Sequence, residues 1–457
     1  MPPHPDIKID FNRAMAENVG EDNGIDIQRL FELEAQTQEI HNGIQAMRGM
    51  GQIPFFHLPS DDDLLNKVQN AAKKYSGKTR DIVVLGIGGS ALGASSLFSA
   101  INGPYANLKP KKPRLFVCDN IDPEAFIDLT HIVHPTKTLF VIVSKSGVTS
   151  ETLAQYLSLR KLKGKRNYFI ITDPHEGALR QWALSEKIPS LEVPTGVGGR
   201  YSVFSAVGLF PLALAGVDIT ELLSGARQMD KRCQKNHVWS NPAAMLAQVF
   251  YLALQDKKKS ELVFMPYSDH LHPVGNWFVQ LWAESLGKQY SLKGEEIYCG
   301  QTPIPCRGVS DQHSQLQLFA EGTNDKIFFF VVPEKWRRDL KMGKISEKQS
   351  EIAFLQNRKM GELLHTEWAA TERALTEAKR PNLTLFIPEI TPHALGQLYQ
   401  LLMSTTVYAG GLLNVNPFDQ PGVERTKQVT RELMKQRELG GLNELIKGRG
   451  GEEKYWV

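Results

Sequence analysis

The sequence is poor in cysteine and has no marked excess of either charge. Its 457 residues include 53 lysines and arginines against 50 aspartates and glutamates, which leaves a formal net charge of +3. A charge this small, spread along the chain, predicts no nucleic-acid partner and no attraction to a membrane surface. The cysteines form no CxxC pair, so we expect neither a disulfide framework nor a metal site; they are Cys118, Cys233, Cys299 and Cys306.

Patterns that mark several other protein classes are missing. No apolar stretch reaches the roughly 18 residues that a membrane-spanning helix requires. The opening segment, residues 1–5, has no basic region followed by an apolar one, so we expect no secretory signal and predict a cytoplasmic protein. The absence of a GxxxxGK[ST] loop, an HExxH motif and a nucleophile elbow argues against nucleotide hydrolysis, zinc peptidase and serine hydrolase chemistry.

The chain does have a globular composition and a regular alternation of short apolar runs with helix-compatible segments. Hydrophobic residues make up 42% and charged residues 23%, as in soluble folded proteins. Continuous apolar strands separated by helices predict parallel sheets covered on both faces. The apolar runs lie at 82–85, 115–117, 139–143, 168–171, 262–264, 327–332 and 383–387.

We therefore predict an α/β fold with two doubly wound parallel-sheet domains. The expected organisation is a helical N-terminal segment over 1–75, a first domain over 76–217, linking helices over 218–258, a second domain over 259–415 and a C-terminal helical tail over 416–457. Helices are expected at 203–215, 219–249, 273–288, 350–378, 392–409 and 424–439.

A glycine-rich loop follows the first predicted strand. It reads G-I-G-G-S-A over 86–91, and glycines there allow a tight turn and bring backbone N–H groups close to an anion at a helix start. Gly89 and Ser90 are therefore candidate phosphate ligands. The loop also satisfies the G-x-G-x-x-A dinucleotide fingerprint with Asp119 as ribose ligand, although Asp119 follows Gly86 by 33 residues and the expected spacing is about 20.

A second loop, rich in hydroxyl groups, follows the strand that ends at Val143. It reads S-K-S-G-V-T-S-E-T over 144–152, and hydroxyls beside free N–H groups at the positive end of a helix dipole suit a phosphate monoester. The alternative is an ordinary N-cap made by Thr149 or Ser150, but capping needs one hydroxyl and this loop offers five. The candidate ligands are Ser144, Lys145, Ser146 and Thr149.

The two loops are expected to share one site. Both follow strands of the same predicted parallel sheet, so both lie at its carboxyl edge. Open α/β sheets bind their ligands at that edge. The predicted ligand is therefore a small phosphorylated molecule.

The motifs resemble those of a known enzyme family. The loops at 86–90 and 144–147 are similar to those of the sugar isomerase (SIS) domain. The segment V-G-G-R-Y-S over 197–202 resembles the first signature of the phosphoglucose isomerase family, and F-D-Q-P-G-V-E-R-T-K over 418–427 resembles the second. The motifs E-S-x-G-K at 284–288 and Q-H-S at 312–314 stand between them in the family's order, and the likeness is to the shorter bacterial branch.

This resemblance implies a fold, a reaction and an assembly. It implies two SIS-type, flavodoxin-like domains in α/β/α sandwiches and an aldose–ketose isomerase that interconverts glucose 6-phosphate and fructose 6-phosphate in glycolysis and gluconeogenesis, without cofactor or metal. It implies a homodimer in which His313 is lent by the neighbouring subunit. It also implies that Lys427 acts with His313 near the sugar ring oxygen and that Gln420 helps to bind substrate.

Glu284 and Arg200 are the candidates for the proton transfer, which moves a proton between C1 and C2 through a cis-enediol. On the helix predicted from Pro273, Glu284 follows Trp277 and Leu281 at i+7 and i+3, which places a carboxylate on the apolar stripe, where partial removal from water suits a general base. The plain alternative is an exposed helical glutamate. Arg200 follows two glycines and could stabilise the enediolate; its alternative is a structural salt bridge.

His313 and Lys427 are the candidates for ring opening. His313 is predicted close to a helix start with Ser310 or Asp311 as N-cap, where the helix dipole disfavours the imidazolium. A lone histidine at such a place is otherwise an ordinary surface residue. Lys427 lies three residues after Glu424, so its alternative is an i, i+3 ion pair.

Two other functions stay open on the sequence. A dehydrogenase is supported only by the glycine loop at 86–91 and explains none of the four candidate catalytic residues. A non-catalytic sugar-phosphate sensor of the SIS type would tolerate loss of the base. The presence of Glu284 favours the enzyme.

Overall fold

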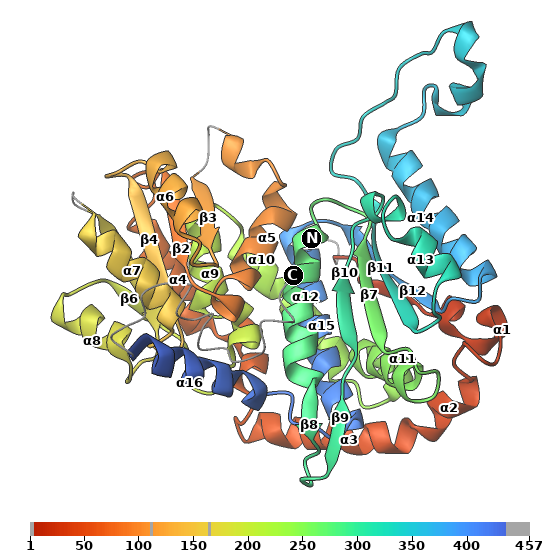
Figure 1. Ribbon diagram of the computed structural model, residues 1–457, viewed down its shortest axis with the longest axis horizontal. Helices are drawn as coiled ribbons and strands as arrows, with labels where there is room; N and C mark the ends of the chain where they lie inside the picture. The colour runs from red at the N-terminus through yellow and green to blue at the C-terminus, as the bar shows by residue number, and fades with distance from the viewer. Residues whose placement is uncertain (1–3, 110–112, 163–165, 436–457) are drawn as a thin grey trace, which may run out of the picture. The chain divides into compact units, whose positions relative to one another are not determined.

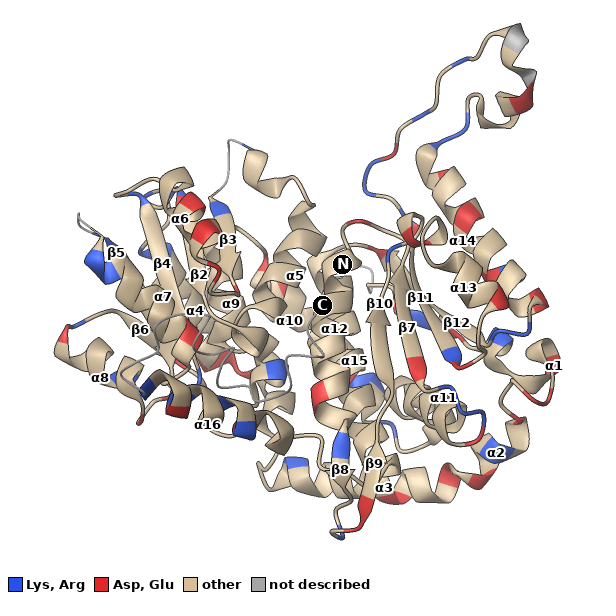
Figure 2. Cartoon of the chain, viewed as in Figure 1, with Lys and Arg blue, Asp and Glu red and all other residues tan. Residues whose placement is uncertain are grey.

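The computed structural model describes residues 4–109, 113–162 and 166–435. Its contacts divide the chain into two compact units, Met1–Pro417 and Phe418–Val457, and the larger unit contains two five-stranded sheets (Figure 1). The five-segment organisation expected from the sequence stays a prediction. Basic and acidic residues are interspersed along the helices around both sheets (Figure 2), in keeping with the small net charge.

The first sheet is parallel throughout, as predicted, with the strand order β3-β2-β4-β5-β6. Its strands form where consecutive residues are apolar: Ile82 pairs with Leu139, and Ile142 pairs with Ile170, and all four side chains are buried. The strands are β2 (Asp81–Leu85), β3 (Arg114–Cys118), β4 (Thr138–Ser144), β5 (Asn167–Thr172) and β6 (Ser190–Glu192).

Helices cover both faces of this sheet. On one face Tyr156 and Leu179 pack with Val83 and Phe140 in a single core. On the other face Phe210 stacks on Phe169 with the ring centroids 4.1 Å apart. The helices of this half are α5 (Leu92–Asn102), α6 (Pro123–Ile132), α7 (Ser150–Lys161), α8 (Ala178–Ser185) and α9 (Ala206–Leu214).

The second sheet has the order β1-β12-β11-β7-β10 and is parallel except for β1. On one face Phe328 packs with Phe319 and Leu375, and on the other Phe264 lies against Phe278 with centroids 4.9 Å apart. The elements are β7 (Glu261–Pro266), β10 (Thr302–Pro305), β11 (Lys326–Lys335), β12 (Asn382–Glu389), α11 (Pro242–Gln255), α12 (His272–Leu286), α13 (Leu316–Glu321), α14 (Met360–Glu377) and α15 (Pro392–Leu412).

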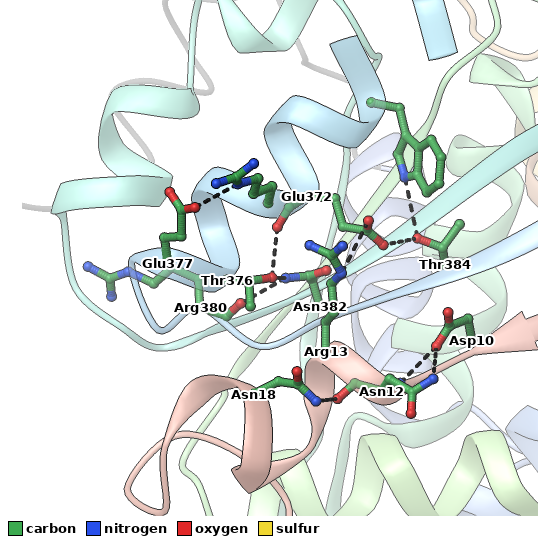
Figure 3. A network of polar contacts seen from close by, with 12 residues as sticks. Asp10, Asn12, Arg13, Asn18, Glu372, Thr376, Glu377, Arg380, Asn382 and Thr384 are labelled. Carbon is green, nitrogen blue, oxygen red and sulfur yellow. Dashed lines mark hydrogen bonds and ion pairs between the residues drawn. The ribbon is translucent and has the colours of Figure 1, made fainter. Parts of the chain in front are cut away.

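The N-terminal segment is not only helical, which corrects the prediction for 1–75. Its first element, β1 (Lys8–Asp10), pairs antiparallel with β12 and forms an edge of the second sheet. Side chains fasten this edge (Figure 3): Arg13 lies 3.3 Å from the buried carboxylate of Glu372, which also accepts a 3.0 Å hydrogen bond from Thr384. The helices that follow are α1 (Ala16–Val19), α2 (Ile27–Glu32), α3 (Glu34–Gly49) and α4 (Asp62–Lys73).

Several helix boundaries differ from the prediction because local signals interrupt the apolar periodicity. The helix expected over 219–249 is two helices, α10 (Ile219–Cys233) and α11, since Asn241 caps a new helix that begins at Pro242. The helix expected over 203–215 is a 3-10 segment, η6 (Gly199–Phe204), followed by α9. Other 3-10 segments are η1 (Asn12–Ala14), η2 (Pro54–Phe56), η3 (Leu58–Ser60), η4 (Gly88–Ser90), η5 (Ala106–Leu108), η7 (Val238–Ser240), η8 (Ser310–Gln312) and η9 (Glu347–Leu355).

Three further segments complete the description. The helix expected over 350–378 begins only at Met360, after η9, and a hairpin that was not predicted follows α12, formed by β8 (Lys288–Tyr290) and β9 (Glu296–Cys299). The tail helix is α16 (Pro421–Lys435), and the predicted continuation over 436–439 lies outside the described residues. Along the described part of the chain, every helix is too short or too polar to cross a bilayer.

Candidate active site

The glycine loop after β2 forms a compact turn at the carboxyl edge of the first sheet. It passes through η4, in which Gly88 has a φ of +55° that favours glycine, and leads into α5. The amides of Ser90 and Ala91 bond within the turn, to Ile87 and Gly88 at 3.1 and 2.9 Å. These two amides are therefore engaged with the loop itself, whereas the half-buried side chain of Ser90 stays at the edge of the sheet.

Gly89 allows this loop to touch the segment that carries Arg200. A Cβ atom at Gly89 would lie 2.1 Å from the carbonyl carbon of Gly199 and 2.7 Å from the amide nitrogen of Arg200. The hydroxyl of Ser202 also donates to the carbonyl of Gly89 at 3.3 Å. The glycine at position 89 is thus explained by contact between two loops of this chain.

Arg200 is buried and held at several points. Only 2% of its side chain is exposed. Its Nε donates to the hydroxyl of Ser285 at 2.6 Å, and one Nη donates to the carbonyl of Pro417 at 2.6 Å. The other Nη lies 3.7 Å from Oε2 of Glu284. The guanidinium is therefore fixed beside the candidate base, and the salt bridge that was the structural alternative exists within the candidate site itself.

Glu284 lies near the end of α12, on the same face as two buried residues. Trp277 and Leu281 are 1% and 0% exposed, whereas the carboxylate-bearing side chain keeps 24% exposure. The side-chain amide of Gln280 donates to Oε2 of Glu284 at 3.1 Å. A Cβ atom at Gly88 would lie 2.8 Å from Nε2 of the same glutamine. The predicted carboxylate is therefore half-buried, oriented by neighbours and open to a ligand.

Gln280 and Ser285 were not singled out from the sequence. Gln280 joins the glycine loop to Glu284, and Ser285 joins Arg200 to α12. The signal for Gln280 was its place one turn before Glu284 on the same helix face. Ser285 belongs to the E-S-x-G-K motif, but its role becomes visible only when η6 packs against α12.

The hydroxyl-rich loop is organised by contacts among its own side chains. The hydroxyl of Ser144, at the end of β4, lies 2.8 Å from that of Thr149 and accepts the amide of Gly147 at 3.1 Å. The hydroxyl of Ser146 lies 3.5 Å from that of Thr149. Thr149 is the N-cap residue of α7, but its side chain makes no capping hydrogen bond. The capping alternative is therefore wrong for Thr149, and the first helical amides of α7 remain available to an anion.

Lys145 faces the same region as Arg200. Burial lowers the pKa of its ammonium group, the field of Arg200 lowers it further, and Asp173 opposes both effects. Within the described ranges the ammonium makes no hydrogen bond or ion pair. A half-buried lysine beside a second cation is electrostatically unfavourable, and a bound dianion would relieve this situation.

His313 is placed differently from the prediction. It is the C-cap residue of η8 (Ser310–Gln312), whereas the following helix, α13, begins at Leu316 with Gln315 at its N-cap. Neither Ser310 nor Asp311 caps that helix, so the argument from the helix dipole does not apply. The imidazole is exposed, and among the described residues it makes no side-chain hydrogen bond or ion pair, with Arg200 and Glu284 or with any other group.

Lys427 and Gln420 belong to the smaller unit of the chain. Lys427 lies on α16, and its ammonium is 2.7 Å from the carboxylate of Glu424, with both side chains more than half exposed. The i, i+3 ion pair expected as the plain alternative is therefore present. Gln420 directly precedes α16.

In the described part of the chain, no group of three or more histidine, cysteine, aspartate or glutamate side chains could hold a metal ion.

Comparisons with known proteins agree on one family. Residues 62–443 match the family described as Phosphoglucose isomerase. The chain is 37% identical over 448 residues to the glucose-6-phosphate isomerase of Carboxydothermus hydrogenoformans, with 94% of each chain covered. It is 38% identical over 406 residues to a glucose-6-phosphate isomerase of Thermus thermophilus, which covers 87% of this chain and 94% of the relative.

Solved structures show the same fold. A hypothetical protein from Thermus thermophilus superposes with a TM-score of 0.82 at 34% identity, covering 94% of this chain and all of that one. A glucose-6-phosphate isomerase from Chlamydia trachomatis superposes with a TM-score of 0.79 over 96% of both chains, at 20% identity. With a family match over most of its length and relatives of this similarity, the chain belongs to the phosphoglucose isomerase family.

Proposed function

We propose that this chain interconverts D-glucose 6-phosphate and D-fructose 6-phosphate with Glu284 as the base that carries a proton between C1 and C2. As a member of its family the chain is an aldose–ketose isomerase of these two sugar phosphates. The observation that supports the assignment of residues is the buried Arg200, whose Nη lies 3.7 Å from the half-buried carboxylate of Glu284.

The proton transfer requires a base and a stabiliser of negative charge. In the open-chain aldose, Glu284 removes the proton from C2, and the electron pair of that bond forms the C1–C2 double bond while O1 gains negative charge. The hydroxyl proton of O2 then passes to O1, the C2–O2 bond becomes the carbonyl of the ketose, and the resulting carboxylic acid returns its proton to C1. A guanidinium already fixed by Ser285 and Pro417 stabilises the enediolate without reorganisation during the reaction.

The phosphate of the substrate is assigned to the two loops at the edge of the first sheet. Ser144, Lys145, Ser146 and Thr149 supply hydroxyls and one cation, and Gly89 and Ser90 supply the facing loop. The support is the cluster of mutually bonded hydroxyls at the start of α7 and the lysine that no described carboxylate neutralises by an ion pair. Binding of a dianion there satisfies both the helix dipole and Lys145.

Ring opening is assigned to His313 and Lys427, with Gln420 as a further substrate ligand. The exposed imidazole is available to a second subunit, which supports a homodimer in which each His313 serves the neighbouring site. Lys427 can exchange its exposed partner Glu424 for the sugar at little cost, because surface ion pairs are weak. We also propose that the protein is cytoplasmic, as expected from the sequence, and that it acts without a cofactor and without a nucleic-acid or membrane partner.

The test is conversion of fructose 6-phosphate to glucose 6-phosphate in buffer with EDTA and no nucleotide, with the product measured after the enzyme has been removed. We expect the wild-type chain to be active and Glu284→Gln to lose about 10³-fold in kcat, the scale of general base catalysis. The control is Glu186→Gln, which also removes a partly exposed carboxylate paired with an arginine, here Arg160 at 2.7 Å. Undiminished activity of Glu284→Gln would contradict the mechanism.

A further inference from the structure

Helix α5 lies between the glycine loop over 86–91, called the phosphate loop below, and α12, the helix that carries Glu284. It begins at Leu92, two residues after Ser90, and packs on η6, where a Cβ at Gly93 would lie 3.0 Å from the side chain of Val203. Any displacement of α5 therefore moves the glycine loop relative to Arg200. The contacts that hold α5 against the helices around the second sheet therefore determine the distance between the glycine loop and Glu284.

A buried tyrosine of α15 bonds to the middle of α5. The hydroxyl of Tyr399 donates to the hydroxyl of Ser96 at 2.5 Å, and Ser96 donates in turn to the carbonyl of Leu92 at 2.5 Å. Tyr399 and Ser96 are 0% and 1% exposed. Because no water competes at such a depth, this hydrogen-bond chain has one favourable geometry, and it ends at Leu92, which directly follows the glycine loop.

The ring of the same tyrosine contacts the base helix. It packs on Trp277 of α12 with the ring centroids 4.1 Å apart. Trp277 is seven residues before Glu284 and so lies on the same helix face, about 10 Å along the axis. Tyr399 therefore contacts α12 with its ring and α5 with its hydroxyl.

We propose that Tyr399 is a positioning residue that sets the register between the phosphate loop and Glu284. The inference rests on the proposed function. There the loops at the first sheet hold the phosphate of the substrate, and C1 and C2 of the same substrate must lie beside the carboxylate of Glu284. Misplacement of a reacting group by about 1 Å can cost as much as a hundredfold in rate. A single buried hydroxyl thus has a measurable effect on proton transfer without touching the substrate.

The same helix provides a matched control. Tyr408 is also buried on α15, and its hydroxyl lies 2.6 Å from Nδ1 of His41 and 2.9 Å from the amide nitrogen of Asn241. These partners belong to α3 and to the cap of α11, away from α5 and α12. The change Tyr408→Phe therefore removes a hydroxyl of the same kind, with at least as many partners, from a place where it cannot affect the register of the site.

The experiment compares Tyr399→Phe, Ser96→Ala, their double variant and Tyr408→Phe in the full chain. For each variant, kcat, KM, the inhibition constant of inorganic phosphate and the thermal midpoint are measured, and rates are referred to folded protein. The inhibition constant of inorganic phosphate reports on phosphate binding alone, because this ligand has no carbon atoms to meet Glu284. Ser96→Ala tests the same hydrogen bond from its other end, so the question remains answerable if one variant folds poorly.

We expect Tyr399→Phe and Ser96→Ala each to lower kcat about tenfold, with phosphate inhibition changed by less than about twofold, and the double variant to be no slower than the single ones, since both remove one interaction. Tyr408→Phe should keep its kcat despite an equal or larger loss of thermal stability. Wild-type kcat in Tyr399→Phe, or a loss in Tyr408→Phe of the same size, would overturn the inference. An inactive wild-type chain would instead overturn the proposed function, and the inference with it.

Discussion

Arg200 illustrates how a single residue is specified by shape as well as by charge. Its Nε and its two Nη groups reach three partners in different directions, Ser285, Pro417 and Glu284. A lysine carries the same charge on one nitrogen and cannot reproduce a planar set of donors. We therefore expect Arg200→Lys to lower kcat about a hundredfold, the typical loss on removing a fixed donor to a developing oxyanion, as measured by steady-state kinetics.

The matched control for this change is Arg380→Lys. Arg380 is also buried, in the turn between α14 and β12, and donates to two carbonyls, those of Ala320 and Gly322. Its replacement should lower the thermal midpoint while leaving kcat within about twofold, because the site is untouched. If both variants lost activity equally, the effect of Arg200→Lys would be one of stability and not of charge placement.

Glu372 is a buried carboxylate that lies beside Arg13, three residues after β1 (Figure 3). Removal from water raises its pKa, and Asp10 adds to this, against the lowering effects of Arg13 and Thr384. The folded protein thus binds a proton that the unfolded chain has already released. Stability due to this proton is complete below the ordinary carboxyl value of 4.5 and is lost as the pH rises through the folded-state pKa.

This sign gives a prediction for Glu372→Gln. The amide oxygen can still accept the hydrogen bond from Thr384 but does not titrate. Relative to the variant, the wild-type protein should lose free energy of unfolding as the pH rises above 4.5, and the difference should level off once the pH exceeds the folded-state pKa. Urea unfolding at a series of pH values from about 4 to about 8 measures it, and parallel curves for the two proteins would contradict the prediction.

At the scale of elements, the sheets were predictable and some of their edges were not. The central strands of both sheets are runs of consecutive apolar residues, such as 82–85 and 327–332, and both runs were found as strands. The strand β1 reads K-I-D with a single apolar residue, and it exists because β12 offers an unpaired edge. Pairing with a partner hundreds of residues away leaves no local signal.

The same limit applies to the candidate site. Glu284 was found from helical periodicity and motif, because both are local. Gln280 acquires its role only from the approach of Gly88, and Ser285 only from the approach of Arg200. The error at His313 arose because Asp311 resembles an N-cap residue. Its carboxylate instead accepts a hydrogen bond from the backbone amide of Arg307, earlier in the same turn, at 2.6 Å. Contacts between elements therefore account for most of what the sequence did not reveal.

The contact between η4 and η6 makes Gly89 a sensitive position. In Gly89→Ala the added methyl group would lie 2.1 Å from the carbonyl carbon of Gly199, so the two segments must separate. We expect a folded protein whose kcat/KM falls by about a hundredfold or more, since both the phosphate loop and Arg200 shift. Steady-state kinetics together with circular dichroism test this.

The control for this change is Gly43→Ala. Gly43 lies inside α3, and a methyl group added there would have nothing within 4 Å. Alanine there should stabilise the helix by about 1 kcal/mol and leave the kinetics unchanged. Normal activity in Gly89→Ala would show that the two loops can separate without harm and that their contact does not shape the site.

At the scale of the whole molecule, the exposed His313 raises the question of which site it serves. If each histidine completes the neighbouring subunit's site, mixing two inactive variants restores activity. A heterodimer of Glu284→Gln and His313→Ala contains one site with both native residues, and the other site lacks both. With random pairing, half the dimers are mixed and half their sites are intact, so we expect about one quarter of the wild-type activity in a symmetric dimer.

The alternative arrangement gives a different result under the same conditions. If His313 served the site of its own chain, every site in the mixture would lack one of the two residues and no activity would return. The variants are therefore unfolded together, refolded at equal concentrations and assayed beside each variant refolded alone. Because each outcome follows from counting sites, the recovered fraction decides whether the monomer is a complete enzyme, independently of how much each side chain contributes to the rate.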